Sequence, residues 1–248
     1  MRPRALILFD VDGTLLITGG ATTRCIWRAA EAVFGRALDR CPLVAGQLDQ
    51  QLFLSIATRC GITDAHEHLA QYKARYLIEL EAELQRMRDQ VKVMPGIIHL
   101  LEELSQRPRD AVAGLLTGNF RDNTMLKLRA AGLDRFSFPV SAFAEDGNQR
   151  SDLVAAALGQ FAKLGEVATP ASVIIVGDTP RDIATARQTG CRVLAVATGA
   201  YSLWQLQSDG PDAAVADLSD PTPLYDLIER VNPPSPSPGN PGEGWGGG

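Results

Sequence analysis

Two aspartates, Asp10 and Asp12, follow a short apolar run near the start of the chain and are separated by one residue. An acid pair with this spacing could hold a divalent cation, or supply a nucleophile and a proton donor. The apolar run, residues 5–9, is typical of a strand buried on both faces, so the acids stand where that strand ends. Ligands gather at this end of a parallel sheet, although the two acids and Gly13 could also form only an ordinary turn.

Polar residues follow three apolar runs in the same way. They are Asp10 and Asp12 after the first run, Thr117 and Gly118 after the second, and Asp178 and Asp182 after a later one. Because neighbouring strand ends converge on one crevice, we expect these groups to meet. Crowded carboxylates are relieved by a hard cation such as Mg²⁺, and a hydroxyl with free backbone amides suits an anion. The set is typical of phosphoryl transfer, with an aspartyl-phosphate as a plausible intermediate.

The order of the apolar patterns predicts an α/β fold with a doubly wound, Rossmann-like parallel sheet. Helical patterns alternate with strand-like runs at residues 5–9, 111–116, 136–142, 172–176 and 192–197. This alternation predicts right-handed crossovers, which place helices on both faces of the sheet.

A long helical stretch interrupts the alternation after the first strand. It covers about residues 17–92, far more than the dozen or so residues that a crossover needs, and we interpret it as an inserted helical cap domain. The α/β core domain then comprises residues 1–16 and 93–231. Residues 232–248 are rich in Pro and Gly and are predicted to form a disordered tail, in which Trp245 could be a docking residue.

Composition and charge indicate which classes of partner to expect. The 248 residues are 45% hydrophobic, enough for a substantial core, and carry a net charge of -5. We expect no nucleic-acid partner, because phosphate backbones are bound by basic surfaces. No apolar run approaches the roughly 20 residues that span a bilayer, so we expect no membrane partner and a cytoplasmic location. The oligomeric state stays open.

Three motifs resemble those of the haloacid dehalogenase superfamily. They are D-V-D-G-T-L from Asp10, L-L-T-G ending at Gly118 and G-D-T-P-R-D ending at Asp182. The match includes order and spacing, spans residues 5 to about 220, and places the helical stretch where the superfamily inserts its C1-type cap. The resemblance implies a Mg²⁺-dependent phosphatase for a small phosphorylated metabolite, similar to phosphoglycolate phosphatases. The true dehalogenases of the superfamily lack the second acid, Asp12 here, and need no Mg²⁺.

The resemblance also implies a role for each matching residue. Asp10 would be the nucleophile that takes the phosphoryl group, and Asp12 the general acid and base. The implied ligands are, for Mg²⁺, the Asp10 carboxylate, the Asp12 backbone carbonyl and Asp178, with Asp182 in support, and, for the phosphate, Thr117 and the amide of Gly118.

The third motif of the superfamily departs from its usual form, because Arg150 stands in place of the usual lysine before a predicted helix. An arginine would bring a fixed charge and a bidentate fork for phosphate, but it is not equivalent to lysine in geometry. Arg150 could instead be an ordinary surface arginine near a helix start. Lys127 and Lys163 are rivals for the role, although both fall within predicted helices.

The cap offers one candidate for substrate recognition. The turn from Gly46 to Asp49, G-Q-L-D, resembles the G-x-T-D turn of phosphoglycolate-phosphatase-like members, with Leu48 in place of Thr. Because a cap closes over the crevice, we hypothesise that Gly46 and Asp49 face the substrate. Asp49 could instead serve only as a helix cap.

Two alternative functions remain at this point. A phosphomutase of the β-phosphoglucomutase type shares the cap and all the acids. A non-catalytic binding protein on the same fold would use the tail as its interaction element, although the intact acid set counts against it.

Overall fold

A computed structural model describes residues 4–231 and contains one six-stranded parallel sheet, in the order β5-β4-β1-β6-β7-β8. The strands are β1 (Ala5–Phe9), β4 (Ala111–Leu116), β5 (Val140–Ala142), β6 (Val173–Gly177), β7 (Arg192–Val196) and β8 (Ala213–Val215). β1 lies inside the sheet, between β4 and β6, so its five residues are all buried. The predicted α/β parallel-sheet fold is confirmed.

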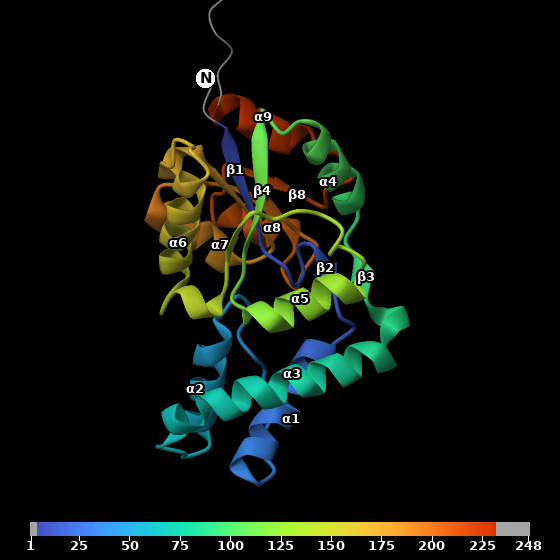
Figure 1. Cartoon of the computed structure of the whole chain (residues 1–248), viewed down its shortest axis with the longest axis vertical. Helices are drawn as coiled ribbons and strands as arrows, with labels where there is room; N and C mark the ends of the chain where they lie inside the picture. The colour runs from blue at the N-terminus through green and yellow to red at the C-terminus, as the bar shows by residue number, and fades with distance from the viewer. Residues whose placement is uncertain (1–3, 232–248) are drawn as a thin grey trace, which may run out of the picture.

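Helices cover both faces of this sheet (Figure 1). Leu6 and Leu8 of β1 belong to the same buried cluster as α6 (Arg150–Lys163) and α7 (Pro180–Thr189). The alternate residues of β1, Ile7 among them, pack with α4 (Ile97–Gln106) and α9 (Thr222–Val231). Burial on both faces explains why β1 reads as a continuous apolar run. The remaining helices of this part are α5 (Arg121–Ala130) and α8 (Leu203–Ser208).

Three helices lie together beyond one end of the sheet (Figure 1), and we call residues 17–92 the cap. They are α1 (Ala21–Phe34), α2 (Asp49–Arg59) and α3 (Leu69–Arg86). Phe53 stacks between Phe34 and Tyr72, at ring-centroid distances of 5.2 and 4.2 Å. The buried Glu83 of α3 pairs with arginines of α1, so packed rings and a buried acid both join the cap helices.

The chain enters and leaves the cap through a short antiparallel pair, β2 (Leu16–Ile17) and β3 (Lys92–Val93). Single-turn 3₁₀ helices flank the longer elements at η1 (Ala65–His68), η2 (Arg88–Gln90), η3 (Ala144–Asp146) and η4 (Pro170–Ser172). Strand β5 is shorter than the range predicted for it, residues 136–142. Helix α4 begins at Ile97, directly after Gly96, which takes a left-handed φ of 80° at a point where a Cβ would lie 1.9 Å from the Leu218 carbonyl oxygen.

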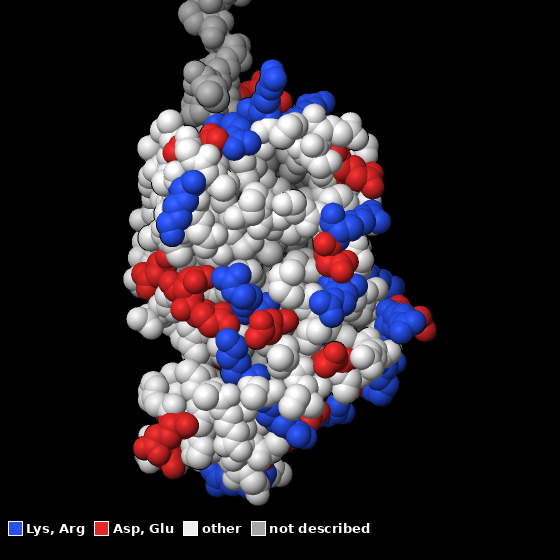
Figure 2. Space-filling model, viewed as in Figure 1, with Lys and Arg blue, Asp and Glu red and all other residues white. Residues whose placement is uncertain are grey.

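The surface is mixed in charge. Basic and acidic side chains are interspersed over the face of the described residues in Figure 2. Within residues 4–231, none of the helices combines the length and the apolar character needed to cross a bilayer. The tail predicted at 232–248, with Trp245, lies outside the described residues.

Candidate active site

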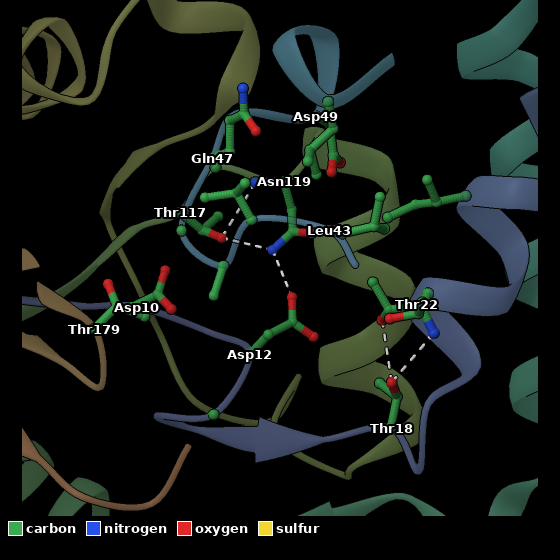
Figure 3. Close-up of a pocket in the computed structure, with 18 of the residues that line it drawn as sticks. Asp10, Asp12, Thr18, Thr22, Leu43, Gln47, Asp49, Thr117, Asn119 and Thr179 are labelled. Carbon is green, nitrogen blue, oxygen red and sulfur yellow. Dashed lines mark hydrogen bonds between the residues drawn. The ribbon is translucent and has the colours of Figure 1, made fainter. Parts of the chain in front are cut away.

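Polar residues after three adjacent strands line one cavity of about 490 Å³ between the core and the cap (Figure 3). Of the predicted site residues, the lining includes Asp10, Asp12, Gly46, Asp49, Thr117, Gly118, Arg150 and Asp178. They converge because β4, β1 and β6 are parallel neighbours that end at the same edge of the sheet. Asp182 is the exception: it is fully buried behind the cavity wall.

Asp10 directly follows β1 and is 6% exposed. Its Oδ1 accepts a hydrogen bond of 2.9 Å from Nη2 of Arg150. Burial, together with the charges of nearby acids, raises the pKa of Asp10 to about 7 against the opposing effect of the Arg150 charge. The carboxyl is therefore held at the cavity by one charged partner, with its other oxygen left for chemistry.

Arg150 is the first residue of α6, and its side chain is buried. Besides Asp10, Nη2 donates to Oδ1 of Asp182 at 2.5 Å and to the carbonyl of Leu116 at 3.3 Å. Nε and Nη1 are also buried, and neither has a hydrogen-bond partner among the described residues. Buried donors normally have hydrogen-bond acceptors, and an oxyanion next to Asp10 would supply acceptors for Nε and Nη1. Lys163, one of its rivals, is exposed near the end of the same helix.

Asp182 holds Arg150 from behind. Its Oδ2 accepts hydrogen bonds from the backbone N–H and the hydroxyl of Thr179, at 3.1 and 2.6 Å, which caps the start of α7. Gly177 makes room for it, because a Cβ there would lie 2.2 Å from the Asp182 carboxyl carbon. The acid predicted to support the metal thus contacts the arginine and the helix start.

Asp178 follows β6, and its Oδ1 accepts a hydrogen bond of 3.1 Å from the hydroxyl of Thr14. Burial raises the pKa of Asp178 to about 8, and the negative charge of Asp10 adds to the shift. Gly13 and Gly199 pass so close that a Cβ at either position would lie 2.4 or 1.7 Å from Oδ2. Two buried acids that repel each other at one strand edge are a donor set suited to a hard cation.

The described residues contain no group of three or more His, Cys, Asp or Glu side chains placed to hold a metal ion. The predicted Mg²⁺ ligands are two carboxylates, Asp10 and Asp178, and the backbone carbonyl of Asp12. That set is compatible with this finding, because Mg²⁺ commonly takes one or two carboxylates and keeps waters or substrate oxygens. The donor chemistry therefore fits the predicted ion.

Asp12 is held by two groups that the sequence did not connect to it. Its Oδ2 accepts hydrogen bonds from Nζ of Lys127 at 2.6 Å and from Nδ2 of Asn119 at 2.7 Å. Asn119 lies between Asp12 and Thr117 (Figure 3), since the same amide nitrogen reaches Oγ1 of Thr117 at 2.7 Å. Its oxygen accepts from Lys127 at 2.8 Å, so the four side chains form one network.

Sequence reasoning missed these roles of Asn119 and Lys127. Asn119 directly follows Thr117 and Gly118, and that position was the signal that could have found it. From the sequence, Lys127 is only a rival to Arg150, and nothing in its helical surroundings marks it as buried. The structure places it beside the predicted general acid and base, while Arg150 stands beside the predicted nucleophile.

Gly118 and the cap turn meet over the cavity. The Gly118 carbonyl accepts a hydrogen bond of 2.7 Å from the backbone N–H of Asp49. A Cβ at position 118 would lie 2.5 Å from the carbonyl oxygen of Gln47, so only glycine permits this approach. Gly46, with a φ of +72°, lies against Thr179 and Arg181 at the start of α7. The predicted G-Q-L-D turn is therefore in contact with the core.

Asp49 begins α2, but Leu48 occupies the capping position of that helix. The Asp49 carboxylate instead accepts a hydrogen bond of 2.8 Å at Oδ2 from the backbone N–H of Phe120, at the start of α5. It is 2% exposed, and burial raises its pKa to about 7 against the opposing charge of Lys127. A cap residue thus binds the first turn of a core helix.

Comparison with known proteins agrees with the three motifs. Residues 7–196 match the family model described as haloacid dehalogenase-like hydrolase. The chain belongs to this family. It is also 30% identical over 215 residues to a phosphoglycolate phosphatase of Synechococcus elongatus, covering 86% of this chain and 93% of the relative. Together with the family match, this similarity identifies the chain as a phosphatase of the family.

Solved structures share the fold at low sequence identity. A predicted phosphoglycolate phosphatase from Haemophilus somnus superposes with a TM-score of 0.67 at 19% identity, covering 90% of this chain and 98% of that one. A putative β-phosphoglucomutase from Thermotoga maritima gives a TM-score of 0.56 at 19% identity, with 91% and 99% covered. At these identities the superpositions support the fold of this phosphatase and leave its substrate open.

Proposed function

We propose that this protein is a Mg²⁺-dependent phosphatase that hydrolyses a small phosphomonoester through an aspartyl-phosphate on Asp10. The observation that carries the proposal is the buried guanidinium of Arg150, which bonds Asp10 through Nη2 while Nε and Nη1 have no partner within residues 4–231. These donors suit the oxygens of a phosphoryl group beside the nucleophile.

The first half of the reaction uses Asp10 and Asp12. An Asp10 carboxylate oxygen attacks phosphorus and forms the new P–O bond, while the bond to the ester oxygen breaks. The leaving oxygen takes its proton from the carboxyl of Asp12. Hydrogen bonds from Lys127 and Asn119 hold this carboxyl at the cavity. Arg150 and Thr117 hold the phosphoryl oxygens in place during the transfer.

In the second half, Asp12 accepts a proton from a water molecule as that water attacks phosphorus, and inorganic phosphate leaves Asp10 restored. Asp10, Asp178 and the carbonyl of Asp12 would hold Mg²⁺, which screens the repulsion between the phosphate and the Asp10 carboxylate. The cap excludes bulk water from the cavity during both steps.

The similarity to a relative named phosphoglycolate phosphatase supports a small phosphomonoester as substrate, and phosphoglycolate is the first compound to test. A cavity of about 490 Å³ accommodates such a molecule. Release of inorganic phosphate, measured against isomerisation of a sugar phosphate, separates this function from the phosphomutase alternative.

The test of the chemistry is Asp10→Asn, assayed with p-nitrophenyl phosphate and Mg²⁺. Asn keeps the shape of the side chain but is a poor nucleophile, so we expect turnover to disappear while the circular dichroism spectrum is unchanged. Substantial turnover by the folded variant would exclude Asp10 as the nucleophile.

A further inference from the structure

Part of the cavity wall comes from the cap, and its side chains are mostly neutral. It includes the polar residues Thr18, Thr22, Thr23 and Gln47 and apolar residues such as Ile26 and Leu43. Thr18 and Thr22 hydrogen-bond to each other at 3.1 Å (Figure 3). This wall can donate and accept hydrogen bonds, and it can pack against carbon atoms.

The charge on the cavity wall is mostly negative. Among the described residues of the lining, Arg150 is the side-chain cation, and it is paired with Asp10 and Asp182. Lys127 lies behind Asp12 and is fully buried. Arg181 lies beside Gly46 but is exposed and outside the lining. Arg24 lies beside Gly19 and Gly20 of the lining and is paired with Glu83, so the cation of the lining itself is at the phosphate end.

Asp49 adds an acid to the cap side of the cavity (Figure 3). Its Oδ2 accepts from the backbone of Phe120, while its Oδ1 accepts no hydrogen bond from the part of the chain that the structure describes. Oδ1 retains accessible surface at the cavity, so a ligand or a water molecule can donate to it. An alcohol hydroxyl can donate to it, and in its ionised form Asp49 would repel a carboxylate or a second phosphate.

We propose that the substrate's leaving group is an uncharged, hydroxylated alcohol, such as a polyol or sugar, and not a carboxylate or a second phosphate. This inference rests on the proposed phosphatase function. Asp49 Oδ1 accepts a hydroxyl of the leaving group, and the threonines and Gln47 contact its other polar groups. An anionic leaving group would be desolvated next to Asp49 and Asp12, while the nearby cations Arg150 and Lys127 are already paired with acids of the protein.

A preference for a neutral leaving group would set this chain apart from its named relative. Phosphoglycolate carries a carboxylate on its leaving group, and its two carbons fill only a fraction of a 490 Å³ cavity. Cavities of a few hundred Å³ suit larger ligands, so size and charge both favour a longer neutral alcohol. Specificity arises here from the repulsion of the wrong ligand as well as from contacts to the right one.

A matched pair of compounds tests the charge rule with the intact enzyme and Mg²⁺. 2-Phosphoglycolate and 2-phosphoglycolamide have the same shape and differ in the charge of the leaving group. We expect kcat/KM to be at least about tenfold higher for the amide, and higher again for glycerol 3-phosphate. Equal or faster turnover of 2-phosphoglycolate would overturn the inference while leaving the phosphatase function intact. If neither compound nor p-nitrophenyl phosphate is hydrolysed, the proposed function fails and the inference fails with it.

A substitution in the wall tests the cause of the preference. Thr23 lines the cavity and is exposed, so a longer side chain fits without repacking the cap. Thr23→Lys adds a cation, and we expect the ratio of kcat/KM values to shift toward 2-phosphoglycolate by about tenfold. Thr23→Gln adds a long neutral side chain and should leave that ratio unchanged. Equal shifts in both variants, or no shift in Thr23→Lys, would show that charge does not set the preference.

Discussion

Lys127 and Asp12 form an ion pair of 2.6 Å that joins helix α5 to the loop after β1. The lysine side chain is fully buried, whereas the aspartate side chain is 34% exposed at the cavity. A buried ammonium without a partner would be strongly destabilising. The pair therefore fixes the side-chain position of the proposed general acid and base from inside the protein.

Replacing Lys127 by Met should reduce kcat more than it changes KM. The variant keeps the length of the side chain but removes the bond that orients Asp12 and leaves the oxygen of Asn119 without a donor. General acid–base catalysis is worth about 100-fold or more, so we expect kcat to fall at least tenfold. Steady-state kinetics measure the effect, with the exposed Lys163→Met as control. An unchanged kcat in Lys127→Met would show that Asp12 needs no such support.

Replacing Arg150 tests its two contacts separately. Arg150→Lys keeps the charge but not the planar fork, so we expect the inhibition constant of inorganic phosphate to rise about tenfold. Arg150→Met leaves Asp10 and Asp182 buried without their cation, which should lower the free energy of unfolding by about 3–5 kcal/mol. Urea titrations measure the stability. Wild-type phosphate inhibition in Arg150→Lys would argue against phosphate binding by this residue.

The sheet and its exit residues could be predicted because both depend on local patterns. Asp10, Thr117 and Asp178 each follow an apolar run directly, and parallel neighbours end at one edge. Strands of two or three residues, such as β2, β3 and β8, are too short to show a period and were not predicted.

The partners of Asp12 could not be predicted, for a different reason. Lys127 lies 115 residues from Asp12 in the sequence, and only the packing of α5 against the loop after β1 brings them together. A lysine within a helical pattern ordinarily faces solvent. In the same way, Asp49 looked like the cap of its own helix, and its bond to the start of α5 depends on how the cap turn meets the core.

Mg²⁺ should stabilise the protein, and more so at alkaline pH. Without metal, burial raises the pKa of Asp10 to about 7 and that of Asp178 to about 8. Below these values protons compete with the cation, so its binding strengthens as pH rises. We expect Mg²⁺ to raise Tm by a few degrees at pH 8.5 and by less at pH 6. Asp178→Asn should abolish the increment, and an equal increment in that variant would exclude Asp178 as a ligand.

The buried carboxyl of Asp49 should make stability depend on pH in a way that Asp49→Asn removes. Its pKa is raised to about 7 from an ordinary value of 3.8, so between these values the folded protein binds a proton that the unfolded chain has lost. Stability from this group is therefore fully present below pH 4 and is lost as pH rises to about 7. The asparagine, neutral throughout, can still accept the bond from Phe120.

Relative to wild type, metal-free Asp49→Asn should accordingly gain stability between pH 5 and pH 8, by up to about 3 kcal/mol. Urea unfolding at the two pH values measures the gain. Asp226→Asn, which changes an exposed acid on α9, serves as the control and should differ from wild type by the same amount at both values. If the Asp49→Asn difference were also independent of pH, the carboxyl would already be ionised in the folded protein at pH 5. The acceptor proposed for the substrate hydroxyl would then be a full negative charge throughout the working range of the enzyme.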